Sequence, residues 1–182
     1  PYWNTIDLDA FTDEQMLWQM IDEAYAAVVN KLTKKARTQL LQLSKLEYLD
    51  TDGSNPDFAF LCEKMDQALD ELVGVKLQRS QYEQYNQRDG IQDVIVVYRD
   101  KTPVACAGYK MFDERHAELK RIYVEPLYRG MGLGSELVRR LEAKAKIHGF
   151  QWCILEIGDL LQTACHICKK LGYKVIPNYG QY

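Results

Sequence analysis

The sequence predicts an α/β protein in which a mixed, mostly antiparallel sheet is flanked by helices. Two observations support this prediction. Short runs rich in β-branched residues occur in the second half of the chain, and stretches with apolar residues at helical spacing precede and separate them. Three strand-like runs in succession, followed by helix, strand, helix and strand, predict one mixed α/β layer.

The first part of the chain is predicted to be helical. Residues 12–15 read Thr-Asp-Glu-Gln, a capping-box pattern, and a second helical stretch is expected from residue 32 to about Leu49. Residues 51–56, TDGSNP, carry Asp-Gly and Asn-Pro turn signals. We therefore predict a helical extension over residues 1–52 and a second unit over residues 53–182. The apolar face of the first helix consists of Met16, Leu17, Met20, Ile21, Ala24, Val28 and Leu32.

The second unit is predicted to alternate between strands and helices. A short strand over residues 56–61 and a helix over 63–73 come first, and a turn around Asp100–Lys101 joins two of the later strands. Strands are expected over residues 93–100, 102–112, 116–124, 151–158 and 173–177, and helices over residues 133–149 and 160–172.

Composition and charge exclude several classes of function. The chain has 182 residues and a net charge of −3 without a long block of like charge, so bulk electrostatics do not favour nucleic acid. No apolar run approaches the roughly 20 residues that span a bilayer, and the first residues lack a signal-peptide pattern. Five scattered cysteines favour reduced thiols and a cytoplasmic protein. The basic cluster Lys31, Lys34, Lys35 and Arg37 is interpreted as a solvated helix face.

A glycine-rich stretch, RGMGLG over residues 129–134, lies between a predicted strand and a predicted helix. Backbone N–H groups at such a helix start can point at one anion, and glycine allows the anion to approach closely. A tight turn is the alternative interpretation, but three alternating glycines beside Arg129 favour phosphate binding. A Walker loop would need Lys and Ser/Thr after Gly134, and the dinucleotide fingerprint has the spacing G-x-G-x-x-G. Neither pattern is present.

The loop residues resemble the pyrophosphate loop R/Q-x-x-G-x-G/A of the GNAT superfamily, the acetyl-CoA-dependent N-acetyltransferases. The similarity extends through residues 117–134, 152–158 and 169–182, and it covers the chain from about residue 58. It implies a GNAT-type sheet. Family members usually carry a further strand after the turn IPNYGQY, whereas this sequence stops at Tyr182. The sheet is therefore expected to be short, to be completed by another chain, or to have lost its last strand by trimming.

The resemblance implies acetyl-CoA as cosubstrate and direct attack by an amine in a ternary complex. The acceptor class stays open between small molecules and peptides or proteins. The pantetheine arm of the cofactor would lie against the backbone of Ile122, Tyr123 and Val124. The pyrophosphate would be bound by the backbone of Arg129, Gly130, Met131, Gly132, Leu133, Gly134 and Ser135.

Two residues are candidates for proton transfer. Glu118 lies eleven residues before Arg129, where some family members carry a catalytic glutamate; the alternative is a strand carboxylate paired with Lys120. A base there would help to deprotonate an amine whose pKa is about 10.4. Cys168 lies four residues before Gly172. At this position, family members often carry a tyrosine that acts as the general acid. Cys168 is either a substitute acid, with a thiol pKa of about 8.5, or a small buried residue.

Strand alternation would place Glu118 with Lys120 and Ile122 on one face of the sheet. The opposite face would then carry Leu119, Arg121 and Tyr123. Tyr123 and Tyr173 are further candidates for the acid. A metal site around Cys165, His166 and Cys168 is not expected, because no second ligand pair exists.

Two alternative functions stay open. The first is a non-catalytic acetyl-CoA-binding sensor or adaptor of the same fold. The second is a regulator whose N-terminal helices bind a partner or DNA, although these helices lack a clear helix-turn-helix pattern. The apolar faces of the same helices would suit a homodimer interface.

Overall fold

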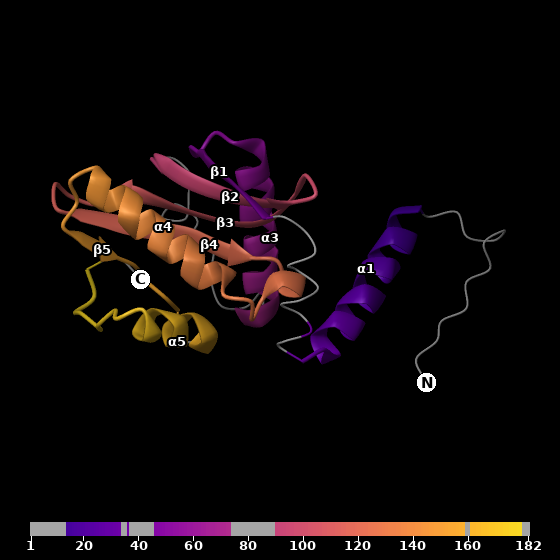
Figure 1. The fold of residues 1–182 in the computed structure, drawn as a ribbon. Coiled ribbons are helices and arrows are strands. Elements are labelled where there is room, and N and C mark those ends of the chain that lie inside the picture. Colours follow the sequence, from indigo (N-terminus) through magenta and orange to yellow (C-terminus); the bar gives the residue numbers. More distant parts are fainter. Residues whose placement is uncertain (1–13, 34–35, 37–45, 74–89, 159–160, 180–182) are drawn as a thin grey trace.

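A computed structural model describes residues 14–33, 36, 46–73, 90–158 and 161–179, and it contains a five-stranded sheet (Figure 1). The strand order is β1-β2-β3-β4-β5, with antiparallel pairing everywhere except between β4 and β5, which are parallel. This architecture confirms the predicted fold class. The strands are β1 (Leu46–Thr51), β2 (Asp93–Arg99), β3 (Thr102–Met111), β4 (His116–Val124) and β5 (Trp152–Ile154).

Helices flank the sheet on both faces, with α3 on one face and α4 on the other (Figure 1). Helix α5 follows β5 and packs beside α4, whereas α1 stands to the side of the sheet. Within the described ranges, no helix has the length and apolar character needed to cross a membrane. The helices are α1 (Glu14–Lys31), α3 (Pro56–Val73), the 3-10 helix η2 (Pro126–Tyr128), α4 (Leu133–Ile147) and α5 (Gln162–Lys170).

The core lies in two layers because the side chains of β2 alternate between the faces of the sheet. Ile95 and Val97 pack in the cluster that contains α4, and Val94 and Val96 pack in the cluster that contains α3. All four are buried, and each contributes about 1.5–3 kcal/mol by leaving water. The continuous run of β-branched residues in β2 therefore reflects burial of both faces of this strand.

A β-bulge interrupts β4. Cys106 pairs with Tyr123 and Gly108 pairs with Lys120, so two residues of β4 oppose Ala107 alone. Arg121, one of those two residues, has φ 56°, in the left-handed region. The extra residue changes the side-chain alternation of the strand.

Because of the bulge, the faces predicted for the last residues of β4 are wrong. Leu119 packs in the α4 layer, whereas Tyr123, four residues later, packs in the α3 layer. Ile122 lies against the α4 layer, and not on the face of Glu118 as strict alternation predicted. The prediction failed because a bulge depends on pairing with β3, which a single strand does not reveal.

Four predicted elements are wrong in type or extent. Residues 46–49 are strand and not helix, because Leu46 and Tyr48 pack against the core while β1 pairs with β2. Residues 56–61 are helix and not strand: the Asn55 side chain accepts hydrogen bonds from the N–H groups of Asp57 and Phe58, a helix cap. Residues 173–177 form no strand, and β5 has only three residues.

The predicted N-terminal helix is confirmed as α1, but its capping residue Thr12 lies outside the described residues. Most of the second helical stretch, residues 34–35 and 37–45, also lies outside them. The division of the chain at residue 52 stays a prediction. Because β1 is part of the sheet, we propose that the second unit begins at or before Leu46.

Candidate active site

The glycine-rich stretch forms the entry to α4. Gly130 and Gly132 have φ values of 77° and 88°, which favour glycine, and Gly132 caps the helix with its carbonyl accepting from the N–H of Glu136 at 2.9 Å. The first N–H groups of α4 have no partner within the helix. They add to the positive end of the helix dipole, so the loop favours an anion.

The loop backbone is open to a ligand. A Cβ atom built on Gly132 would meet no heavy atom within 4 Å, and one built on Gly134 would meet only a methyl group of Val124 at 4.0 Å. A side chain at either position would therefore occupy space that a bound group could otherwise fill. These residues fit a pyrophosphate.

Arg129 ties the loop to the end of β4. Its Nε donates to the carbonyl oxygen of Val124 at 2.9 Å, and its guanidinium lies 5.7 Å from the ring centre of Tyr123. Burial, and then the Glu125 carboxylate, raise the pKa of Tyr123 to about 12, against the opposing charge of Arg129. Tyr123 therefore stays protonated near neutral pH.

The two parallel strands part next to this loop. In the described part of the chain, β4 and β5 pair from His116 with Trp152 to Glu118 with Ile154, and no pairing follows. The later part of β4 still pairs with β3 through Tyr123 and Val124. Its other edge, toward β5, offers backbone groups to which an extended amide-containing chain can hydrogen-bond.

Glu118 is a buried carboxylate held by two ammonium groups. Only 3% of the residue is exposed, and its oxygens lie 3.2 Å from Nζ of Lys110 and 2.9 Å from Nζ of Lys120. Its neighbours Ala117 and Leu119 pack in the α4 layer, so Glu118 points to the opposite face of the sheet. The pairing supplies the partners that a buried charge requires.

Cys168 lies elsewhere, in the layer of α4 and α5. It is buried, and burial raises the pKa of its thiol, as do the neighbouring Cys165 and the Glu142 carboxylate of α4. Glu118 faces the other side of the sheet, so the structure does not bring these two predicted residues together. The predicted cofactor residues of β4 and of the loop, in contrast, lie side by side through the Arg129–Val124 hydrogen bond.

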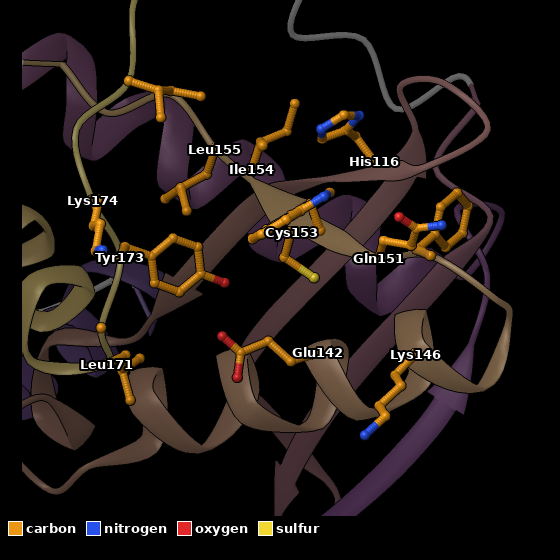
Figure 2. Close-up of a pocket in the computed structure, with 14 residues that line it drawn as sticks. His116, Glu142, Lys146, Gln151, Cys153, Ile154, Leu155, Leu171, Tyr173 and Lys174 are labelled. Atoms are coloured by element: carbon orange, nitrogen blue, oxygen red, sulfur yellow. The ribbon is translucent and has the colours of Figure 1, made fainter.

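A pocket of about 890 Å³ opens between α4, β5 and residues 171–176 (Figure 2). Glu142, Cys153 and Tyr173 point toward one another inside it. Within the described chain no hydrogen bond of ordinary length reaches the buried Tyr173 hydroxyl. Burial, followed by the adjacent Glu142, raises the pKa of Tyr173, and the same two causes raise the pKa of Cys153 to about 11. Tyr173 and Cys153 therefore stay protonated near neutral pH.

Sequence reasoning missed Lys110 and Glu142. Lys110 faces Glu118 across the β3–β4 hairpin, so counting outward from the hairpin turn could have found it. Glu142 lies on a helix between basic residues, and nothing in the sequence indicates that it faces a pocket. No group of three or more His, Cys, Asp or Glu side chains in the described part of the chain could hold a metal ion.

Comparisons with known proteins agree with this geometry. Residues 58–173 match the acetyltransferase (GNAT) family. A curated relative, named IAA acetyltransferase, from Azospirillum brasilense is 30% identical over 89 residues, which are 48% of this chain and 58% of the relative. The chain spans about half the length of the curated relatives it matches.

Solved structures share the fold. A putative acyl-CoA N-acyltransferase from Klebsiella pneumoniae has a TM-score of 0.60 and 23% identity, covering 75% of this chain and 88% of that one. A predicted acetyltransferase from Clostridium acetobutylicum, solved with acetyl-CoA, has a TM-score of 0.56 and 17% identity, covering 76% of this chain and 96% of that one.

Proposed function

Because the chain belongs to the GNAT family of acetyltransferases, we propose that it transfers an acetyl group from acetyl-CoA to an amine. The amine nitrogen attacks the thioester carbonyl carbon directly in a ternary complex, the C–S bond breaks, and CoA leaves as the thiolate. The observation that carries the proposal is the open glycine loop at the start of α4, beside the part of β4 that β5 does not pair with.

The cofactor-binding residues follow from this loop. We assign pyrophosphate binding to the backbone N–H groups of residues 129–135, which combine open space with the positive end of α4. The amides of the pantetheine arm would pair with the backbone of residues 122–124, where β5 leaves the strand edge open. Arg129 is proposed to hold these two parts in register through its bond to Val124.

Glu118 is the proposed acceptor of the proton that the amine loses. Its carboxylate lies on the β4 face opposite α4, so an amine arriving from that side would meet a base while acetyl-CoA occupies the loop. Lys110 and Lys120 fix the position of the carboxylate. Protonation of Glu118 would leave both ammonium groups without their counter-charge.

The leaving thiolate is proposed to take its proton from water. Cys168 is remote from Glu118, and the raised pKa of its thiol makes it a weak acid. We propose that Cys168 is a small side chain that fills the contact between α5 and α4. Cys168→Ala should therefore leave the turnover number within about twofold of wild type, since general acids contribute about 100-fold or more where they act.

Isothermal titration with acetyl-CoA tests the cofactor site. Wild type should bind, and Gly132→Glu should lose binding because it places bulk and negative charge in the loop. Gly149→Glu is the matched control: Gly149 has φ 91°, an equally open Cβ position, and lies at the other end of α4. Loss of binding in both variants, or no binding to wild type, would remove the proposal.

A second candidate function is a non-catalytic acetyl-CoA-binding module. The observation that favours it is the double ion pair of Glu118, which accounts for the buried carboxylate without a catalytic role. A panel of small amines, polyamines, amino acids and peptides, followed by release of free CoA, separates the two functions. Acetyl-CoA binding without amine-dependent CoA release would favour the module.

A further inference from the structure

Helix α1 contacts the segment that leads into the glycine loop. It packs against η2, whose last residue directly precedes Arg129 (Figure 1). Figure 1 shows the C-terminal end of α1 nearest to η2 and its N-terminal end directed away from the sheet. Val29, near that C-terminal end, is only 3% exposed. This helix precedes the residues that match the family, so the contact is an addition to the family domain.

Arg99 joins α1 to η2. Its Nη1 donates a long hydrogen bond of 3.4 Å to the hydroxyl of Tyr128, and its guanidinium lies 5.6 Å from the centre of the Tyr128 ring. Tyr25 of α1 also lies near enough to Arg99 to raise the pKa of the guanidinium. Burial lowers the pKa of Arg99, but the interactions with Tyr128 and Tyr25 raise it by more, so the guanidinium stays charged.

Arg99 is a fixed point in the sheet. It is the last residue of β2, where it pairs with Leu46 on one side and Thr102 on the other. Its side chain is only 20% exposed. A contact to Arg99 therefore connects η2 and α1 to a residue that is paired within the sheet.

The two residues before the first glycine of the loop are therefore each held by a hydrogen bond. Tyr128 is held by Arg99, and Arg129 by the carbonyl of Val124. Gly130 and Gly132, with positive φ, follow at once. Because glycine restricts the backbone least, the direction of the loop N–H groups depends on how firmly the preceding residues are held.

We propose that α1 sets the affinity of the glycine loop for the pyrophosphate of acetyl-CoA, acting through Tyr25, Arg99 and Tyr128. This inference rests on the proposed function. Arg99 is a positioning residue in this proposal: it holds Tyr128 and thereby the loop, and it does not touch the substrate. Displacement of α1 by any partner would then weaken cofactor binding without altering the residues that face the amine.

The test measures dissociation constants for three ligands. Acetyl-CoA carries the pyrophosphate and the 3′-phosphate, acetyl-dephospho-CoA lacks only the 3′-phosphate, and acetylpantetheine lacks the nucleotide and both phosphates of the pyrophosphate. The first two are titrated calorimetrically, and the third, a weaker ligand, by NMR. The variants are Tyr25→Phe and Arg99→Met, with Val28→Ala as the control because Val28 is an exposed residue of the same helix.

In Tyr25→Phe and in Arg99→Met, the affinities for acetyl-CoA and for acetyl-dephospho-CoA should fall by the same factor. That factor should be about threefold to tenfold, as for the loss of one hydrogen bond. The double variant should lose less than the product of the two factors, since both act through one contact. Binding of acetylpantetheine and the behaviour of Val28→Ala should not change.

Three outcomes would overturn the inference. Unchanged acetyl-CoA affinity in Tyr25→Phe would show that α1 is not coupled to the loop. An equal loss of affinity for acetylpantetheine would indicate general damage to the site. An effect of Arg99→Met on acetyl-CoA alone would make Arg99 a direct ligand of the 3′-phosphate. Failure of wild type to bind acetyl-CoA is a separate result, which removes the proposed function and this inference together.

Discussion

At the scale of single residues, the proposed chemistry of the site depends on one buried carboxylate and its two partners. Glu118→Gln keeps the size of the side chain and removes its ability to accept a proton at neutral pH. If Glu118 is the base, the turnover number should fall about 100-fold to 10,000-fold, while the dissociation constant for acetyl-CoA stays the same. Steady-state kinetics and calorimetric titration measure the two quantities.

The control for this substitution is Glu114→Gln. Glu114 is an exposed carboxylate in the β3–β4 turn and belongs to neither the site nor the core. It should leave both quantities unchanged. A turnover number within threefold of wild type in Glu118→Gln would assign Glu118 a structural role with Lys110 and Lys120.

The residues of the loop were predictable from sequence, whereas the partners of Glu118 were only half predictable. Gly130 and Gly132 act through local backbone conformation, which a short motif reveals. Lys120 lies two residues from Glu118 and was identified as a partner in the alternative interpretation. Lys110 comes from another strand, and finding it requires counting outward from the β3–β4 hairpin turn, not the pattern of one strand alone.

At the scale of elements, close packing beside the bulge of β4 leaves no room for a side chain at Gly108. A Cβ atom on Gly108 would lie 2.6 Å from a side-chain carbon of Ile91 and 2.9 Å from the backbone oxygen of Asp93. The oxygen belongs to the neighbouring strand, so it cannot move without moving β2. Gly108→Ala should therefore lower the free energy of unfolding by about 1–3 kcal/mol.

Chemical denaturation measures this effect, and Gly158→Ala is its control. A Cβ atom at Gly158 would meet nothing within 4 Å, so this substitution should not destabilise the protein. Equal stability of Gly108→Ala and wild type would mean that β2 and β3 can separate locally at no cost.

Element type was predictable where a segment carries its own signal. Strand β2 has a continuous β-branched run, and α4 has apolar residues at helical spacing; both were found within a few residues. Strand β1 was mistaken for helix, because its order comes from pairing with β2 and not from its own composition. Residues 56–61 were mistaken for strand, although the Asn55 cap and Pro56 at the first helical position are signals of a helix start.

A group of ion pairs links β1, β2 and the C-terminal end of α4. Asp93 of β2 lies 3.2 Å from Nζ of Lys144 and 3.2 Å from Nδ1 of His148, and Lys144 also reaches Asp50 of β1 at 2.9 Å. Burial raises the pKa of Asp93, but hydrogen bonds from Tyr109 and Lys144 and the nearby positive charges lower it by more. The net pKa of Asp93 is below its ordinary value.

This shift predicts a pH dependence of stability. A carboxyl group with a lowered pKa in the folded state stabilises the protein above its unfolded pKa of about 3.9, and that contribution is lost as pH falls through the folded value. Asp93→Asn should therefore reduce stability at pH 7 and flatten the loss of stability below about pH 4. Denaturation between pH 2.5 and 7 measures both effects, and parallel curves for the two proteins would contradict the prediction.

At the scale of the whole molecule, the sheet separates two approaches to the site. The glycine loop starts α4 on one face, and Glu118 points to the other, so acetyl-CoA and the amine are proposed to meet across β4 from opposite sides. This arrangement could not be predicted from sequence, because the bulge at Arg121 shifts the faces of β4. The separation of Cys168 from Glu118 is equally a property of the assembled layers.

Ligand binding should stabilise the whole fold, since the loop exists as a binding site only when α4, β4 and η2 are assembled. A ligand that binds only the folded state adds about 2.7 kcal/mol at a concentration 100 times its dissociation constant. Wild type and Gly149→Glu should therefore show a saturable rise in Tm with acetyl-CoA, whereas Gly132→Glu should show none. Because Gly132 and Gly149 both have positive φ and open Cβ positions, the two variants should carry similar backbone strain and have similar Tm values without ligand. A rise in Tm for Gly132→Glu equal to that of wild type would place the binding site outside the glycine loop.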